Sequence, residues 1–183
     1  RDVEDEAYMF AAGQELMGEN VFCTALAGEE IGRMKSWGMH PTSRAEHQLS
    51  SPTLMNDLPQ TFMEPLLFRT ACSRGTQARL STEYVSHEQD GDGVTTTCLD
   101  RLTGKTFTVR SRYLVGADGG NSKVAEHAGL AFEGRMGVAG SMNILFEADL
   151  SRYVAHRPSV LYWVLQPGAD VGGIGIGLVR MGR

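Results

Sequence analysis

Apolar residues recur at helical spacing in two parts of the chain. Between Arg1 and Met17 they mostly stand three or four positions apart in an otherwise acidic segment, and this spacing predicts a helix. The same repeat over Thr61–Cys72 predicts an amphipathic helix, which Ser73-Arg74-Gly75 should end. Between these helices, Val21–Leu26 and Gly32–Trp37 have the composition of strands.

The hydrophobic period then changes to two, which is typical of β-strands. Three runs alternate in this way: residues 80–87, 94–99 and 107–113. Asp-Gly and Thr-Gly turns separate the runs, at 89–93 and 102–105, so the sequence predicts an antiparallel β-meander.

Helix and strand patterns alternate again towards the end of the chain. Lys123–Gly129 predicts a short helix that ends at its glycine. Further strand-like runs cover Ser141–Phe146, Ser159–Gln166 and Gly173–Val179, and Pro167–Asp170 predicts a turn between the last two. The whole pattern predicts a mixed α/β (α+β) fold.

Composition and charge exclude several classes of protein. The 183 residues are 42% hydrophobic and 21% charged, and 17 basic against 22 acidic residues give a net charge of −5. This balance argues against binding nucleic acid or anionic membranes through bulk charge. No apolar run approaches the roughly 20 residues that span a bilayer. Three scattered cysteines indicate reduced thiols in the cytoplasm, with neither a disulfide frame nor a zinc site.

The most informative stretch is Val115–Ser122, where a predicted buried strand runs into three glycines, an aspartate and a helix. Glycine lets the backbone approach a ligand closely, and Asn121 or Ser122 can cap the helix. Free N–H groups at a helix start favour anions or polar oxygens. Asp118 would repel a phosphate, so it fits sugar hydroxyls, ordered water or a nearby Arg. An equally open interpretation is a structural corner in which Asp118 bonds its own turn.

Other motifs lack the context that their chemistry needs. Ala71–Gly75 approaches a nucleophile elbow, but the predicted helix and strand stand in the wrong order. Glu88–Gly93 imitates the start of an EF-hand loop between strands, so a hairpin turn is favoured. The histidines show no metal-ligand spacing and are expected at the surface or in hydrogen bonds: His40, His47, His87, His127 and His156. We predict no metal site.

Residues 113–122, Tyr-Leu-Val-Gly-Ala-Asp-Gly-Gly-Asn-Ser, resemble the second fingerprint of the flavin-dependent aromatic hydroxylases, the p-hydroxybenzoate hydroxylase-like family. The meander before it fits this family, as does Leu58-Pro59-Gln60 ahead of a helix. The run from Arg157 to Gly168 resembles the chlorophenol hydroxylases within the family. The resemblance covers essentially the whole chain and implies the central part of an FAD-binding hydroxylase fold, with the meander and a second, mostly antiparallel substrate sheet.

The resemblance also implies domains and site residues. It assigns 1–20 and 61–132 to an FAD-binding domain and 21–60 and 133–183 to a substrate-binding sheet domain. The implied cofactor-binding residues are Gln60, Gly116, Asp118, Gly119 and Gly120. The implied substrate-pocket residues are Tyr162 and Trp163. They point to opposite faces of their strand, so one of them should face the sheet interior, and in this family that sheet roofs the aromatic substrate pocket; core packing alone can also explain both.

The activity that the resemblance implies is ortho-hydroxylation of a phenol or chlorophenol to a catechol by FAD, NADPH and O2, through a flavin C4a-hydroperoxide. No catalytic residue is assigned. Lys123 stands near the position where the family usually has an Arg, so it would take over any role of that Arg. The family's GxGxxG pattern is absent from the sequence, so we expect an internal fragment of a longer enzyme, which could form a homo-oligomer. The alternatives are another FAD-dependent oxidoreductase of the superfamily or a cofactor-free β-rich binding module.

Overall fold

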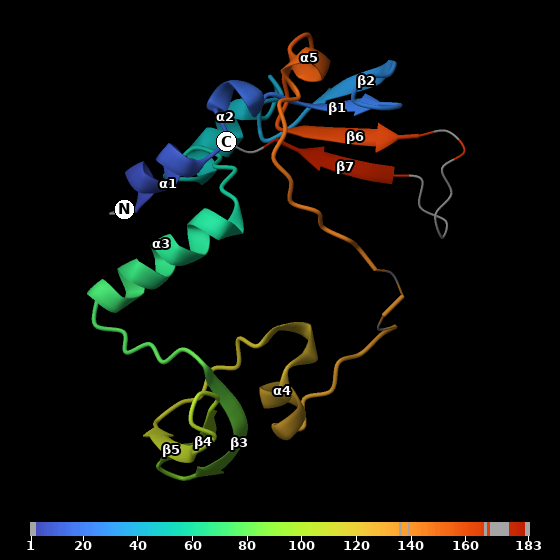
Figure 1. Cartoon of the computed structure of the whole chain (residues 1–183). Helices are drawn as coiled ribbons and strands as arrows, with labels where there is room; N and C mark the ends of the chain where they lie inside the picture. Colours follow the sequence, from blue (N-terminus) through green and yellow to red (C-terminus); the bar gives the residue numbers. More distant parts are fainter. Residues whose placement is uncertain (1–2, 136, 139, 167, 169–175, 182–183) are drawn as a thin grey trace. The chain divides into compact units, whose positions relative to one another are not determined.

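The computed structural model describes residues 3–135, 137–138, 140–166, 168 and 176–181. The chain forms two compact units (Figure 1). The first unit comprises Arg1–Thr76 and Leu145–Arg183, and the second comprises Gln77–Ile144. Compactness does not reveal which ligand a unit binds, so the predicted division into FAD and substrate domains stays a prediction.

The predicted N-terminal helix is shorter in the structure than its apolar spacing suggests. Helix α1 covers Glu4–Phe10, and a single 3-10 turn, η1, follows at Gln14–Leu16. The backbone N–H of Ala12 donates to the carbonyl of Asp57 at 3.0 Å, and Gly13 is a poor helix former. A long-range hydrogen bond therefore replaces the next helical turn.

The second predicted helix is confirmed as α3, Gln60–Ser73. It ends at Arg74, and Gly75 follows with a φ of +96° that an L side chain rarely adopts. The ring of Phe62 in α3 stacks on Phe10 of α1, with centroids 5.2 Å apart. Two short helices were not predicted: α2, Arg44–Ser50, and α5, Ser151–Val154.

A four-stranded mixed sheet, in the order β2-β1-β6-β7, forms the core of the first unit (Figure 1). Its strands are β1 (Glu19–Cys23), β2 (Glu30–Lys35), β6 (Leu161–Leu165) and β7 (Ile176–Arg180). The β1–β2 and β6–β7 pairs are antiparallel, whereas β1 and β6 are parallel. The mostly antiparallel second sheet is thus confirmed. Val21, Cys23 and Tyr162 are fully buried on one face of it.

One predicted strand, Ser141–Phe146, is wrong. These residues have no regular secondary structure, and the side chains of Met142 and Leu145 are 84% and 91% exposed. A strand needs a hydrogen-bonded neighbour, and no described strand pairs with this segment. Of the last predicted strand, residues 173–175 lie outside the described part, as does most of the turn predicted at 167–170.

The second unit contains the predicted meander, which is confirmed as an antiparallel sheet in the order β3-β4-β5. The strands cover β3, Thr82–Asp90; β4, Gly93–Asp100; and β5, Thr106–Ser111. In the first turn the carboxylate of Asp90 accepts hydrogen bonds from the backbone N–H groups of Asp92 and Gly93, at 2.8 and 3.1 Å. The predicted short helix follows as α4, Lys123–His127.

Candidate functional site

The candidate site is the corner between β5 and α4, which we call the glycine corner, residues 113–122. It differs from the predicted buried strand: residues 112–118 form no strand, and the side chain of Val115 is 83% exposed. Hydrophobicity and β-propensity at 113–115 predicted a strand, but no described strand pairs with this segment. The 3-10 turn η2, Gly119–Asn121, then leads into α4.

Two positions of the corner require glycine, one because of a close contact and one because of its backbone conformation. A Cβ on Gly116 would come within 2.8 Å of the Val124 side chain, so only glycine allows this approach of the corner to α4. Gly119 has a φ of +78°, in the left-handed region. No atom lies within 4 Å of the position that a Cβ on Gly119 or Gly120 would take, so this part of the corner is open.

Asp118 is held by its own turn. Its Oδ1 accepts a hydrogen bond from the Ser122 hydroxyl at 2.5 Å, and its Oδ2 accepts one from the backbone N–H of Val124 at 3.2 Å. These bonds, that from Ser122 first, lower the pKa of the Asp118 carboxyl, which is ionised at neutral pH. Ser122 caps α4 by accepting from the N–H of Ala125 at 3.0 Å. The interpretation in which Asp118 bonds its own turn therefore describes these contacts, and the residue remains exposed.

Both ends of α4 are tied to strand β3. At its start, the Lys123 ammonium pairs with the carboxylate of Glu83 at 2.7 Å, and Glu83 also accepts from Arg101 at 2.5 Å. These two cations lower the pKa of Glu83. At the other end, the ring of His127 lies within hydrogen-bond distance of the Tyr84 hydroxyl. Lys123, near the family's usual Arg position, is thus engaged by the meander.

The corner opens on two cavities within the second unit. One of about 580 Å³ is lined by Gly116, Ser122 and Val124 together with the β3–β4 turn. The other, of about 520 Å³, is lined by Gly120, Asn121, Ser122 and the segment after α4 up to Phe132. The corner is therefore neither filled by side chains nor turned away from open space.

The other predicted cofactor residue, Gln60, begins α3 and is exposed. It belongs to the first unit and the glycine corner to the second. Four of the predicted residues lie together in the corner of the second unit: Gly116, Asp118, Gly119 and Gly120. Gln60 lies in the first unit.

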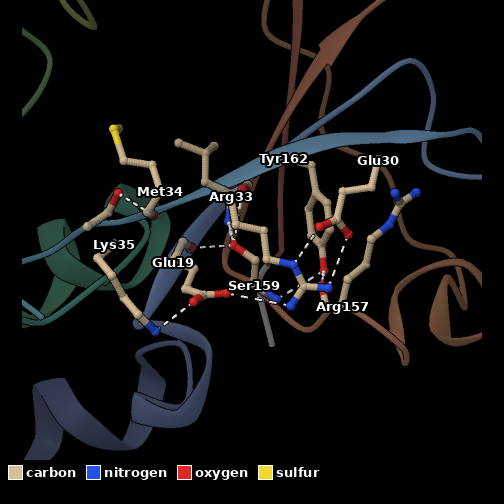
Figure 2. Close-up of polar contacts among 10 residues, drawn as sticks. Glu19, Glu30, Arg33, Met34, Lys35, Arg157, Ser159 and Tyr162 are labelled. Atoms are coloured by element: carbon tan, nitrogen blue, oxygen red, sulfur yellow. Dashed lines mark hydrogen bonds and ion pairs between the residues drawn. The ribbon is translucent and has the colours of Figure 1, made fainter. Parts of the chain in front are cut away.

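Tyr162 and Trp163 lie on opposite faces of β6, as the strand period predicted. Tyr162 is fully buried; its hydroxyl donates to the carbonyl of Arg157 at 2.7 Å and accepts from the N–H of Ser159 at 3.0 Å (Figure 2). Burial raises the pKa of this hydroxyl. Trp163 lies on the other face, where its ring stacks on Phe22 of β1 with centroids 5.8 Å apart.

Sequence reasoning missed Arg157, which is only 1% exposed. Its Nη2 donates to the carbonyls of Ala25 and Leu26, at 3.2 and 2.7 Å, while Nε and Nη1 are buried without a partner among the described residues. Arg157 thereby joins the β1–β2 turn to the segment before β6. Arg157 begins the run that resembles the chlorophenol hydroxylases, but no pattern predicted its burial, because an arginine is almost never fully buried without a paired carboxylate.

A surface ion network crosses the β1–β2 edge of the same sheet (Figure 2). Glu19 accepts from Lys35 at 2.6 Å and lies 3.5 Å from Arg33, which also pairs with Glu30 at 2.8 Å. The cations lower the pKa of both glutamates. Exposed ion pairs of this kind add little to the free energy of unfolding. Within the described residues, no cluster of three or more His, Cys, Asp or Glu side chains could hold a metal.

The profile of a family described as "FAD binding domain" matches residues 1–179. The chain is 58% identical over 181 residues to 2,4-dichlorophenol 6-monooxygenase of Cupriavidus pinatubonensis, covering 99% of this chain and 30% of that protein. It is 48% identical over 163 residues to phenol 2-monooxygenase of Pseudomonas sp., covering 89% of this chain and 25% of that protein.

A solved structure agrees. The flavin-dependent monooxygenase PieE, in complex with FAD and substrate, superposes with a TM-score of 0.82 at 40% identity, covering 91% of this chain and 29% of that one. The chain therefore spans about a third or less of the length of the relatives it matches. Among the helices that the structure describes, none combines the length and apolar composition of a membrane span.

Proposed function

We propose a function from one premise, which is that this chain belongs to the FAD-binding domain family. The chain is part of an FAD-dependent monooxygenase that hydroxylates a phenol or chlorophenol at the ortho carbon, giving a catechol. One observation carries this proposal: the high identity, over almost the whole chain, to a 2,4-dichlorophenol 6-monooxygenase. FAD, when bound, supplies the chemistry that activates O2, and the residues of this chain bind FAD and orient the aromatic substrate.

The glycine corner is the part of the chain that we assign to FAD. Gly119 and Gly120 leave room for backbone N–H groups to approach the cofactor, and the exposed carboxylate of Asp118 can accept hydrogen bonds from sugar hydroxyls. The bonds from Ser122 and Val124 keep Asp118 ionised, so it acts as an acceptor. Gln60 is proposed as a second cofactor contact, on the resemblance alone.

The aromatic substrate is assigned to the Trp163 face of the four-stranded sheet. Tyr162 cannot offer its hydroxyl to a ligand, because the hydroxyl is buried and already makes two hydrogen bonds. Trp163 and Phe22 instead present a stacked, partly buried aromatic pair. A Cβ on Gly32, which pairs with Phe22, would meet nothing within 4 Å. A flat apolar surface with adjacent space suits an aromatic ring.

The remaining assignments are proposals of the same kind. The FAD-binding domain would comprise 1–20 and 61–132, and the substrate domain 21–60 and 133–183. NADPH is proposed as the reductant and the cytoplasm as the location, which the three unpaired cysteines suit. We also propose that the protein forms a homo-oligomer and binds neither nucleic acid nor membranes.

The test uses a full-length enzyme in which this chain replaces the matching part of the 2,4-dichlorophenol 6-monooxygenase of Cupriavidus pinatubonensis, hereafter the chimera. Asp118→Ala should weaken FAD binding by roughly tenfold, the effect of losing a hydrogen bond to a charged group, and slow NADPH oxidation. Asp5→Ala, which removes an exposed carboxylate in α1, is the matched control.

Three outcomes are separable. Unchanged flavin content and NADPH oxidation in Asp118→Ala would favour a cofactor-free binding module. NADPH oxidation by the chimera without conversion of a phenol to a catechol would favour another oxidoreductase of the superfamily. Catechol formation that depends on Asp118 supports the proposal.

A further inference from the structure

The hydroxyl of Tyr84 in β3 lies between two imidazole rings. It is 2.7 Å from Nδ1 of His87, on the same strand, and 2.9 Å from Nδ1 of His127, in α4. Tyr84 and His87 are partly buried and His127 is exposed. A hydroxyl has one hydrogen, so it can donate to only one of these nitrogens and must accept an N–H from the other. The three side chains therefore form one coupled hydrogen-bond chain.

These hydrogen bonds connect β3 to α4, the helix that directly follows the glycine corner. His127 is the last residue of α4, and Ser122, which caps the start of α4, donates to Asp118. With Glu83 holding Lys123, two consecutive residues of β3 fasten both ends of a helix of five residues. Such a short helix is not stable by itself, so its position depends on these side-chain contacts.

We propose that Tyr84 is a positioning residue for FAD binding: through His127 it fixes α4, and through α4 it fixes the glycine corner. This rests on the proposed function, which assigns the corner to FAD. The cavity of about 580 Å³ supports it, because His87 lines this cavity together with Gly116, Ser122 and Val124. Asp118 is also near enough for its charge to contribute, after burial, to the raised pKa of the Tyr84 hydroxyl.

The contact is sensitive to protons. When both imidazoles are doubly protonated, each Nδ1 is a donor, the Tyr84 hydrogen has no acceptor and two cations face one oxygen. The charged groups around the cluster are Asp118, Glu126 on α4, the Glu83–Lys123 pair, and Asp90, Asp92 and Arg112 along the cavity wall. Acidification therefore loosens α4 while the ion pair at its other end persists.

The experiment measures the FAD dissociation constant of the apo-chimera by flavin fluorescence at a series of pH values from about 8 to about 5.5. The unsubstituted chimera should bind FAD more weakly at the acid end. Tyr84→Phe keeps the ring and removes the hydroxyl; it should weaken binding by roughly threefold to tenfold at the alkaline end, the effect of one or two hydrogen bonds, with little further loss on acidification.

His127→Gln is the second variant, because an amide keeps a hydrogen-bond partner but takes up no proton. At the alkaline end it should bind FAD more tightly than Tyr84→Phe does, and it should lose most of the pH dependence. Tyr153→Phe is the matched control in the first unit, since no described residue accepts or donates a hydrogen bond at its hydroxyl.

Two results would overturn the inference. One is FAD affinity in Tyr84→Phe equal to that of the unsubstituted chimera at every pH. The other is the same pH dependence in His127→Gln as in the unsubstituted chimera, and this variant decides the matter if Tyr84→Phe fails to fold. A chimera that binds no FAD at any pH would instead overturn the proposed function, and this inference with it.

Discussion

Tyr162→Phe is the substitution that most directly separates a structural tyrosine from a substrate-contacting one. The change removes a single oxygen from a side chain that is fully buried among Val21, Cys23 and neighbouring apolar groups. The ring keeps its packing, so the effect isolates the hydroxyl and its two hydrogen bonds, to the Arg157 carbonyl and the Ser159 N–H.

The magnitude follows from what the missing hydroxyl leaves behind. One buried backbone carbonyl and one buried backbone N–H lose their partner, and each such group costs about 1–3 kcal/mol. The two groups lie in one short loop and can relax together, so we expect a combined loss of about 2–4 kcal/mol in the free energy of unfolding. This exceeds the roughly 0.5 kcal/mol typical of a surface substitution.

The assay is urea unfolding of the 183-residue chain, followed by tryptophan fluorescence. Both tryptophans, Trp37 and Trp163, belong to the first unit and report on the sheet that contains Tyr162. With a denaturant slope of about 2 kcal/mol per molar urea, the midpoint should fall by about 1–2 M at unchanged slope. Tyr153→Phe should leave the midpoint where it is.

A stable Tyr162→Phe protein would refute this reasoning. If its midpoint stays within the spread of the Tyr153→Phe control, while the chimera carrying Tyr162→Phe shows a raised KM for the phenol, the hydroxyl serves the substrate and the Trp163 face is misassigned. A lowered midpoint with unchanged KM supports the assignment of the substrate to the Trp163 face and of Tyr162 to the core.

Four further outcomes are expected. In the chimera, Trp163→Leu should raise the KM for a phenol roughly threefold to tenfold, from the loss of stacking, and unaltered KM would count against the Trp163 face. Arg110 and the Asp92 N–H lower the pKa of Asp90 to about 2. These contacts stabilise the folded chain fully above the unfolded pKa of about 3.9, and the stabilisation is lost as pH falls through about 2. An NMR titration midpoint near 4 for Asp90 would contradict the contacts. Ser122→Ala should cost α4 about 1 kcal/mol, the value of an N-cap, seen as faster amide exchange at Ala125. The 183-residue chain alone should bind FAD more weakly than about 1 µM, because its sequence lacks the GxGxxG pattern that receives the pyrophosphate.

Patterns of local origin could be predicted from the sequence. The meander followed from alternation and turn residues, and the contacts of Asp90 with its own turn show why such signals are strong. Helix α3 followed from its repeat and its glycine. The four glycine-corner residues of the candidate site could be found for the same reason, since Gly116, Asp118, Gly119 and Gly120 adjoin one another in the sequence.

Contacts between distant residues could not be predicted. The early end of α1 depends on a bond from Ala12 to Asp57, and the segment Ser141–Phe146 has strand-like residues but no described strand beside it. Arg157 joins Ala25 and Leu26, more than 130 positions away. Tyr84 and His127 are 43 residues apart, and no spacing rule connects a tyrosine on one strand to a histidine on a later helix.

The meander contains none of the predicted cofactor residues, but it positions the glycine corner, which contains four of them. The corner lies so close to α4 that Gly116 tolerates no Cβ, and Asp118 accepts a hydrogen bond from the Val124 N–H, so we expect a displacement of α4 to displace the corner as well. The position of α4 in turn depends on Glu83 and Tyr84, both in β3. Substitutions in β3 should therefore change cofactor affinity without touching the cofactor. Substitutions at residues 106–110 of β5 should not, because no comparable contact of β5 with α4 is found among the described residues; Ser111 is excepted, since it donates to the carbonyl of Tyr113 in the corner. We expect this difference between the two outer strands of the meander because β3, and not β5, holds α4 and through it the corner.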